Sequence, residues 1–217
     1  MSSVAQPYPP LTGLGVVAAK EALRTAIRAE RAKRSARMLT RAADDIAQVV
    51  GDMPEVRAAR CVAAYVSRPT EPGTVPLVER LARRGTRVLL PVLGAGLARD
   101  WAAFTHVEDL VERAPGRPPE PGGPPLGAEA LAEADAIVAP ALAIDTSGAR
   151  LGQGGGWYDR VLAHAAPGTP VIAVVFPEEL YDAAERPLPR EPHDRTVDLV
   201  ATTAGWRRLD AERPVTG

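Results

Sequence analysis

The sequence predicts an α/β fold, a three-layer sandwich of helices around a mainly parallel β-sheet. Short apolar segments rich in β-branched residues alternate with segments whose apolar residues recur at helical spacing. This order of strand, helix and strand is typical of parallel strands joined by right-handed crossovers. The length of 217 residues suits one domain. We expect residues 17–217 to form it, behind a flexible tail at residues 1–16, where prolines and glycines show no periodicity.

Apolar spacing and turn residues predict each element of the first half. The helical region has two possible internal start signals, Ser35 and Thr40. Gly85 is placed to end a helix, and Trp101 is expected in the core. The predicted elements are, in order, helical residues 17–50, a break at 51–57, a buried strand at 61–66, an amphipathic helix at 75–84 and a strand at 87–93.

The second half begins with a proline-rich segment, residues 113–127. It cannot be regular helix or central strand, so we expect an extended surface excursion within the domain. The elements predicted after it are a short helix at 128–134, a buried strand at 136–144, a helix at 158–164, a strand at 171–176, a short helix at 177–184 and a last strand at 197–202.

Composition excludes several classes of protein. The 26 basic and 27 acidic residues nearly cancel, so no overall field favours nucleic acid or an anionic membrane. The single Cys61 cannot form a disulfide framework, and the three histidines lack metal-binding spacing. No apolar run approaches the roughly 18 residues needed to cross a bilayer. We therefore expect a soluble, cytoplasmic protein without membrane or nucleic-acid partners.

The most informative segment is the glycine-rich stretch from Arg150 to Arg160. It lies between a predicted strand and a predicted helix. Glycines let backbone N–H groups approach a ligand, and the start of a helix favours an anion, so the expected ligand is a phosphate. Asp159, at the helix start, can cap the helix or hold a divalent metal. Neither standard nucleotide motif fits, because no Lys follows the glycines and Trp157 stands where the dinucleotide pattern needs glycine. A plain tight turn is the alternative.

Three other places carry candidate functional groups. Lys20, Arg24 and Arg28 share one face of the first predicted helix, either as a solvated stripe or as a phosphate clamp. Glu71 is the only acid in a turn-rich loop after the carboxyl end of a strand, where ligands gather in open α/β sheets. Asp194 lies in a loop rigidified by prolines. Exposed surface charge is the alternative for each.

The glycine-rich stretch Arg150-Leu151-Gly152-Gln153-Gly154-Gly155-Gly156-Trp157-Tyr158-Asp159-Arg160, preceded by a strand ending in Pro-Ala-Leu-Ala-Ile-Asp, resembles the signature of the 5-formyltetrahydrofolate cyclo-ligase family. The resemblance covers roughly residues 20–203. It implies the fold of ribose-5-phosphate isomerase and glucosamine-6-phosphate deaminase.

The resemblance also implies roles for individual residues. Lys20 and Arg24 match the amino-terminal nucleotide contact, and Val66 and Glu71 match folate-binding positions. Asp159 and Asp194 match magnesium-associated acids. The residues that match the ATP-binding loop are Arg150, Leu151, Gly152, Gln153, Gly154, Gly155, Gly156, Trp157 and Tyr158, of which residues 153–157 also match the substrate-contacting part. The chain departs from the family pattern at Gln153, Trp157 and Glu178-Glu179, which bears on substrate preference and rate.

The implied reaction is ATP-dependent cyclisation of 5-formyltetrahydrofolate to 5,10-methenyltetrahydrofolate, with Mg²⁺, through an iminophosphate intermediate. Arg150 and Asp159 are the expected catalytic residues, and a monomer is expected. Two alternatives remain from the sequence. One is a sugar-phosphate isomerase or deaminase of the same fold class acting without ATP. The other is a folate- or nucleotide-binding protein without turnover.

Overall fold

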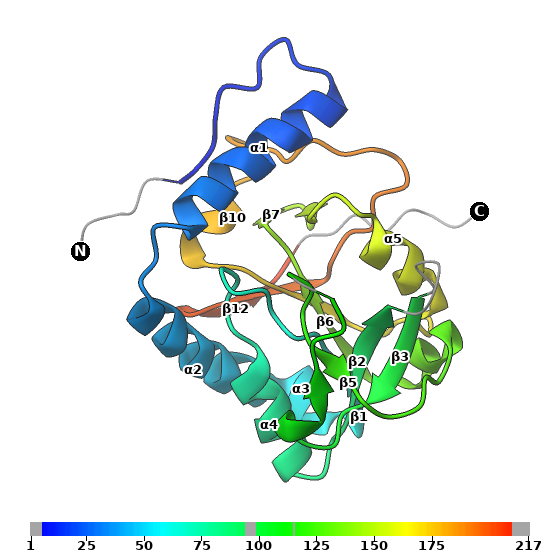
Figure 1. Cartoon of the computed structure of the whole chain (residues 1–217). Helices are drawn as coiled ribbons and strands as arrows, with labels where there is room; N and C mark the ends of the chain where they lie inside the picture. The colour runs from blue at the N-terminus through cyan, green and yellow to red at the C-terminus, as the bar shows by residue number, and fades with distance from the viewer. Residues whose placement is uncertain (1–5, 94–98, 115, 210–217) are drawn as a thin grey trace.

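The structure, a computed structural model, describes residues 6–93, 99–114 and 116–209 (Figure 1). No helix in these ranges is long and apolar enough to span a membrane. The α-helices are α1 (Val16–Arg31), α2 (Ala36–Asp52), α3 (Pro54–Ala58), α4 (Val75–Arg83) and α5 (Trp157–Val161). Short 3₁₀ helices are η2 (Val107–Asp109), η3 (Ala128–Glu133), η4 (Leu162–His164) and η5 (Pro177–Glu179).

A seven-stranded sheet forms the centre of the molecule, in the order β12-β11-β9-β6-β1-β2-β3. The strands from β11 to β2 in this order are parallel, and the two edge strands are antiparallel to their neighbours. The sheet is therefore mainly parallel, as predicted. Its strands are β1 (Cys61–Ala63), β2 (Arg87–Leu93), β3 (Arg99–Ala103), β6 (Ala136–Pro140), β9 (Val171–Val174), β11 (Leu199–Thr202) and β12 (Gly205–Arg208).

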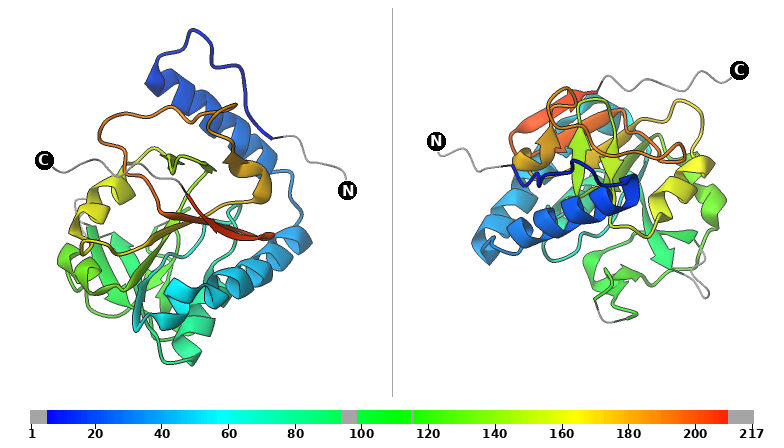
Figure 2. Two further views of the ribbon diagram at one scale, coloured as in Figure 1. Left: turned by 180° about the vertical axis from the view of Figure 1, so that it is seen from behind. Right: turned by 90° about the horizontal axis from the view of Figure 1, so that it is seen from above.

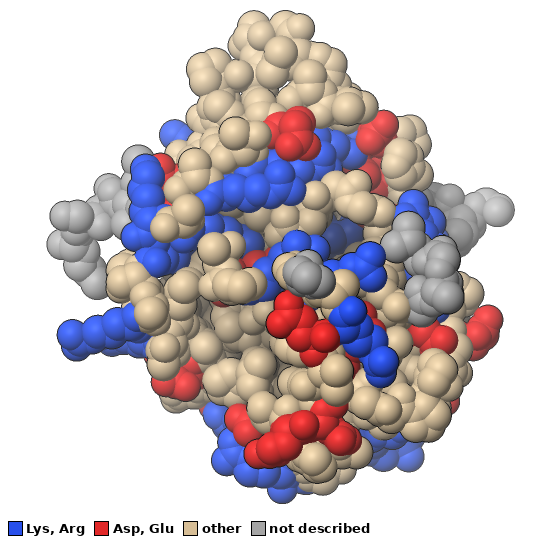
Figure 3. Space-filling view, viewed as in Figure 1, with Lys and Arg blue, Asp and Glu red and all other residues tan. Residues whose placement is uncertain are grey.

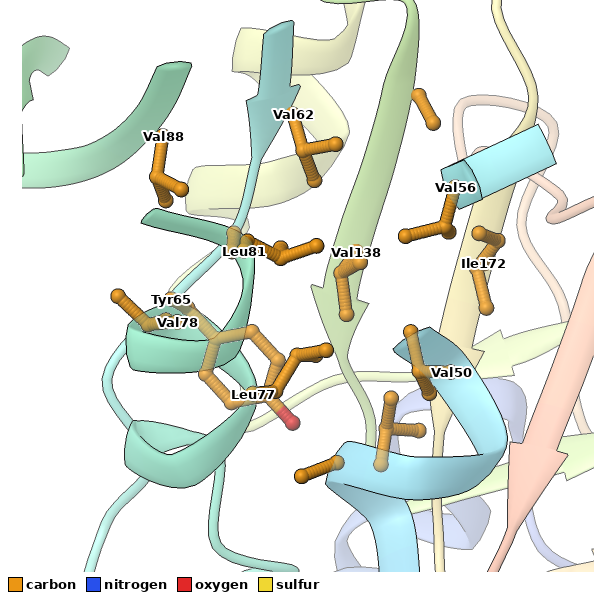
Figure 4. Packing of buried hydrophobic residues seen from close by; sticks show 14 of the residues in the cluster. Val50, Val56, Val62, Tyr65, Leu77, Val78, Leu81, Val88, Val138 and Ile172 are labelled. Atoms are coloured by element: carbon orange, nitrogen blue, oxygen red, sulfur yellow. The ribbon is translucent and has the colours of Figure 1, made fainter. Parts of the chain in front are cut away.

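Helices cover both faces of this sheet. On one face α2, α3 and α4 pack through residues such as Val50, Val56 and Leu77 against the strand residues Val138 and Ile172 (Figure 4). On the other face η3, α5 and η4 pack against the strands in a second buried cluster. The predicted three-layer α/β sandwich is confirmed. Trp101 is fully buried in the second cluster, as expected for a core residue.

A smaller sheet lies beside the main one, in the order β10-β7-β8. Its strands are β7 (Ala143–Asp145), β8 (Arg150–Leu151) and β10 (Leu180–Tyr181). Helix α1 packs on this sheet through Leu23 and Ile27, in a third buried cluster. Figures 1 and 2 show α1 set apart from α2 and α4, beside the segment that leads into β11.

Local signals explain several boundaries. Ser35 accepts a hydrogen bond from the backbone N–H of Met38, so it caps α2, and Thr40 lies within that helix. Gly85 adopts a positive φ of 85° after α4, where the backbone N–H groups of Gly85 and Thr86 donate to the last carbonyls of the helix. The predicted break at 51–57 is smaller than expected, because only Met53 separates α2 from α3.

Three strand predictions need correction. The strand predicted at 61–66 ends at Ala63, and the one predicted at 171–176 ends at Val174. The apolar run at 136–144 is two strands in different sheets, because the chain leaves the main sheet after Pro140.

The remaining differences lie nearby. The helix predicted at 177–184 is only η5, followed by β10. The helix predicted at 158–164 begins at Trp157 as α5 and continues as the 3₁₀ helix η4. Strand β12 was not predicted. The short helix predicted at 128–134 is the 3₁₀ helix η3.

Two irregular segments also bear on the predictions. Within the predicted tail, Tyr8 packs edge-on against Tyr181 and donates a hydrogen bond to the Pro187 carbonyl. Such contacts are not expected of a flexible tail. Residues 1–5 lie outside the described ranges. The proline-rich excursion includes β5 (Glu120–Pro121), paired with β4 (Leu110–Val111). Residue 115 and residues 94–98 are outside the description.

Candidate active site

A cleft of about 780 Å³ opens where the sheet reverses its strand order. From β1 the chain moves to β2 on one side, and later from β6 to β9 on the other, so the switch lies between β1 and β6. Val66 follows β1, Pro140 ends β6, and both line the cleft. Open α/β sheets bind ligands at this position, beyond the carboxyl ends of the strands.

Every residue that the sequence predicted for the site lines this one cleft. They come from four separate parts of the chain. The set is Lys20, Arg24, Val66, Glu71, Arg150, Leu151, Gly152, Gln153, Gly154, Gly155, Gly156, Trp157, Tyr158, Asp159 and Asp194.

Helix α1 supplies a positively charged wall. Arg24 Nε donates to the Gly152 carbonyl over 3.0 Å, and Arg28 Nη2 donates to the Gln153 carbonyl over 2.9 Å. Figure 3 shows a band of basic side chains along α1 on this face of the molecule. Arg24 and Arg28 of the predicted stripe therefore contact the glycine loop, and all three residues, Lys20 included, line the cleft.

The glycine loop joins β8 to α5 and lies next to this wall. Gly154 has a φ of 106° and Gly156 a φ of 59°, which L-residues with a Cβ rarely adopt. A Cβ on Gly152 would lie 3.0 Å from a guanidinium nitrogen of Arg150. Glycines at these positions thus allow the turn and leave room for the arginine beside it.

Arg150 and Asp159 form an ion pair across this loop. Arg150 Nη2 lies 2.7 Å from Asp159 Oδ1, and Arg150 Nη1 donates to the Pro140 carbonyl over 3.3 Å. The Arg150 side chain is almost fully buried. The backbone N–H of Arg195 also donates to Asp159, which brings the loop after Asp194 to the same place. The guanidinium is fixed by these contacts at the cleft wall.

Glu71 is a buried carboxylate with defined partners. Its Oε2 accepts a hydrogen bond from the backbone N–H of Arg68 over 2.8 Å. Its Oε1 accepts one from Gln153 Nε2 over 2.7 Å and lies 3.9 Å from Arg31 Nη1. Arg31 is itself buried and paired with Glu179 over 2.7 Å. A buried carboxylate with these partners can accept N–H groups of a polar ligand.

Lys20 joins two acids of the proline-pinned loop. Its ammonium lies 2.6 Å from Asp194 and 2.8 Å from Glu191. Burial alone would lower the pKa of Lys20, but its hydrogen bonds to the two acids raise it above the ordinary value. Burial opposes ionisation of Asp194, whereas the hydrogen bonds from Lys20 and the Glu191 N–H lower the pKa of Asp194 overall. Both groups are therefore charged near neutral pH.

The predicted metal acids lie in the same cleft but in different clusters. Ligand atoms of Glu191, His193 and Asp194 lie within 4.8 Å of one another, close enough to hold a cation. Asp159 is outside that group and pairs with Arg150 instead. Carboxylate oxygens suit Mg²⁺, so the chemistry of both acids fits the metal implied by the sequence.

Aromatic side chains form the base of the cleft. Trp157 packs edge-on against Trp101 and Tyr158, with ring centroids 5.4 and 4.9 Å apart. Burial raises the pKa of the Tyr65 and Tyr158 phenols well above the ordinary value, so both stay protonated. Within the described residues, Trp157 Nε1 and the Tyr158 hydroxyl have no hydrogen-bond partner. Both are buried donors, and both residues line the cleft.

Sequence reasoning missed part of the lining. Glu191 carried a signal, because it stands three positions before Asp194 in the proline-pinned loop. Tyr65 and the segment 118–120 carried none, because only the fold brings the proline-rich excursion to the cleft. Glu178 and Glu179, noted as departures from the family, do not line it and instead pair with Arg34 and Arg31.

An open α/β sheet with a basic, glycine-lined cleft at its switch point defines a class of enzymes that bind small anionic ligands. The family model described as the 5-formyltetrahydrofolate cyclo-ligase family matches residues 16–203. The chain belongs to this family, and it is an enzyme, a ligase of folate one-carbon metabolism.

Individual relatives agree with this assignment. A 5-formyltetrahydrofolate cyclo-ligase of Mycolicibacterium smegmatis is 45% identical over 148 residues, 66% of this chain and 73% of the relative. The solved 5,10-methenyltetrahydrofolate synthetase of Aquifex aeolicus superposes with a TM-score of 0.74 at 26% identity, covering 91% of this chain and 96% of the other. The synthetase of Mycoplasma pneumoniae shares the fold, with a TM-score of 0.63 at 19% identity over 83% of this chain and 96% of that one.

Proposed function

We propose that this chain catalyses the ATP-dependent cyclisation of 5-formyltetrahydrofolate to 5,10-methenyltetrahydrofolate, with release of ADP and phosphate. The observation that carries the proposal is the pairing, in one cleft, of a buried acceptor carboxylate, Glu71, with a wall of cations and a glycine loop. One half suits a heterocycle rich in N–H groups and the other suits phosphates. One chain supplies both halves, which supports a monomeric enzyme acting on small molecules.

The folate side of the cleft is assigned to Glu71 and its surroundings. The carboxylate accepts N–H groups of the pterin ring, and Val66 and Trp157 provide apolar and aromatic contact. Arg31 Nη1 lies 3.9 Å from Glu71 Oε1 and places a positive charge beside the buried acceptor.

The nucleotide side is assigned to the glycine loop with Lys20, Arg24 and Arg150. Backbone N–H groups of the loop approach the phosphates where no Cβ intervenes. The cations offset charge on the transferring phosphoryl group. Lys20 and Arg24 come from the same face of α1, so one helix presents both.

Magnesium is assigned to Asp159 and Asp194, whose oxygen ligands suit it. Bound there, the ion would neutralise charge on the nucleotide phosphates. In the structure the two carboxylates are paired with Arg150 and Lys20, so these cations hold the acids at the cleft wall.

The chemistry requires positioning more than a side-chain nucleophile. The formyl oxygen attacks the γ-phosphate, giving an iminophosphate and ADP; N10 then closes the ring and phosphate leaves. A formyl oxygen is a weak nucleophile, and aligning it with the phosphorus is worth about 7–11 kcal/mol of the barrier. Glu71 and the glycine loop line the same cleft, an arrangement suited to holding the two substrates next to each other.

The test is a coupled spectrophotometric assay. Purified protein, 5-formyltetrahydrofolate and Mg-ATP should give methenyltetrahydrofolate absorbance and ADP in equal amounts, with none when ATP is omitted. Calorimetric binding of both ligands without product would support a binding protein instead. Turnover of a sugar phosphate without ATP would favour the isomerase class.

A further inference from the structure

We propose that Gln153 is a specificity-determining residue whose side-chain amide occupies the Glu71 carboxylate in the unliganded enzyme and competes with the N–H donors of the substrate. Displacing this amide is then part of substrate binding, and it sets the apparent affinity for the folate. The inference rests on the proposed function, because it takes Glu71 as the acceptor for the heterocycle.

Glu71 is held in place independently of Gln153. The Arg68 backbone N–H binds Oε2 over 2.8 Å, and Arg31 lies 3.9 Å from Oε1. Only 5% of Glu71 is exposed. Among the described residues, the hydrogen bond from Gln153 Nε2 is the one that Oε1 accepts, so this oxygen is the acceptor that a ligand must take over.

Gln153 is fixed in this position from behind. Arg28 Nη2 donates to the backbone carbonyl of Gln153 over 2.9 Å and to the side-chain Oε1 of Gln153 over 3.3 Å. The amide oxygen thus faces α1 while the amide nitrogen faces Glu71. The side chain bridges the cleft from the α1 wall to the folate side.

The hydrogen bond from Gln153 to Glu71 is strong enough to affect ligand binding, and the Gln153 side chain has room to leave it. A hydrogen bond to a charged group is stronger than a neutral one, so the bridged state is well populated. Gly152 and Gly154 flank Gln153, and a Cβ on Gly155 would meet nothing within 4 Å, so the loop backbone has room to turn the side chain away.

The consequence for affinity follows from the population of the two states. A ligand that needs a free Glu71 binds only the fraction of molecules in which Gln153 has left, so the apparent Kd rises as that fraction falls. An amide that mimics the donor of the substrate therefore weakens binding. The Gln153 amide also disfavours ligands without N–H groups. Such ligands would displace the amide from Glu71 and leave the carboxylate unpaired.

The test compares Gln153→Ala and Gln153→Met with the wild-type protein. Methionine has a similar length but no donor. We expect both variants to lower the Kd for 5-formyltetrahydrofolate about fivefold, measured by calorimetry without ATP, since one net hydrogen bond no longer competes. The KM for the folate should fall in parallel. Gln48→Ala, an exposed site on α2, is the matched control.

A Kd that is unchanged or raised in both variants would overturn the inference, a rise meaning that Gln153 contacts the substrate directly. This result is distinguishable from failure of the proposed function, in which the wild-type protein itself gives no ATP-dependent product. Melting temperatures of the variants near that of the wild type show that any change in Kd does not arise from unfolding.

Discussion

At the scale of single residues, the cleft is built from acids that are each paired with a cation. Asp159 binds Arg150, Asp194 binds Lys20, and Glu71 lies near Arg31. Such pairing holds each side chain in one position. Less side-chain entropy then has to be lost when a ligand binds. The positions of these three acids are therefore set before a ligand binds.

Asp159 offers the clearest test of an assigned role. Asp159→Asn keeps an oxygen that can accept from Arg150 but removes the negative charge. We expect kcat to fall by about 100-fold or more, the size of effect seen when one electrostatic contact to a transition state is lost. The free energy of unfolding should fall by about 1–3 kcal/mol, because the hydrogen bond is retained while the buried Arg150 guanidinium loses its counter-charge.

The measurement combines the coupled assay with urea unfolding. Asp44→Asn, at an exposed position of α2, is the control for a charge change alone and should leave kcat unchanged. A rate for Asp159→Asn close to that of the wild type would remove Asp159 from the catalytic site.

Much of this residue-level arrangement could be predicted. The glycine loop and its flanking charges form a contiguous motif, and Lys20 and Arg24 follow helical spacing, so local rules identify them. Contacts across the cleft could not be predicted. The bond between Gln153 and Glu71 joins residues 82 positions apart, and nothing near either residue in the sequence indicates the other.

At the scale of elements, Asp135 links the starts of two central strands. It precedes β6, and its carboxylate accepts hydrogen bonds from the backbone N–H groups of Arg60 and Cys61 over 2.8 and 3.0 Å, at the start of β1. The hydrogen bonds from Cys61 and Arg60 lower the pKa of Asp135 below its ordinary value of 3.8. The carboxylate thus fixes the strands on either side of the switch point.

The sign of this shift predicts an acid-dependent effect. A lowered pKa means that the contribution of Asp135 to stability is present above about pH 4 and is lost as the pH falls through the folded-state value. Asp135→Ala should therefore lower the urea midpoint at about pH 6, and its difference from the wild type should shrink towards about pH 3. A difference that stays constant over this range would contradict the assignment.

Element types could be predicted well where one apolar pattern governs a segment, as in α4 and β2. The run at 136–144 could not, because its residues are apolar throughout while the chain passes from one sheet to another at Pro140. Proline has no N–H for the ladder, and this position was the one local signal of the change. Strand β12 lacked a signal because its side chains are mostly exposed.

At the scale of the whole molecule, α1 is attached through a buried ion pair. Arg31 binds Glu179 through two hydrogen bonds of 2.8 and 2.7 Å and donates to the Ala141 carbonyl. Arg34 pairs with Glu178 and lies over the Phe176 ring. These contacts join the end of α1 to η5 and so hold the basic wall of the cleft against the small sheet.

Removing one member of this pair should be costly. Glu179→Ala leaves the Arg31 charge buried without its partner, so we expect the free energy of unfolding to fall by about 3–5 kcal/mol, as for other broken buried pairs. Chemical denaturation measures it. Glu30→Ala, which breaks the exposed pair with Lys33, should cost less than about 1 kcal/mol. Equal effects of the two substitutions would mean that the pair does not hold α1.

The pairing of Lys20 with Asp194 has a consequence for biosynthesis. The two residues stand 174 positions apart, and α1 is made first. At a synthesis rate of about 5–20 residues per second, roughly 10–35 seconds pass before the ribosome supplies its partner. Until β7, β8 and β10 have been synthesised, the apolar side of α1, with Leu23 and Ile27, has no sheet to cover it. The nascent chain therefore exposes an apolar surface of the kind that chaperones bind, and the cleft cannot be complete before Asp194 has been added.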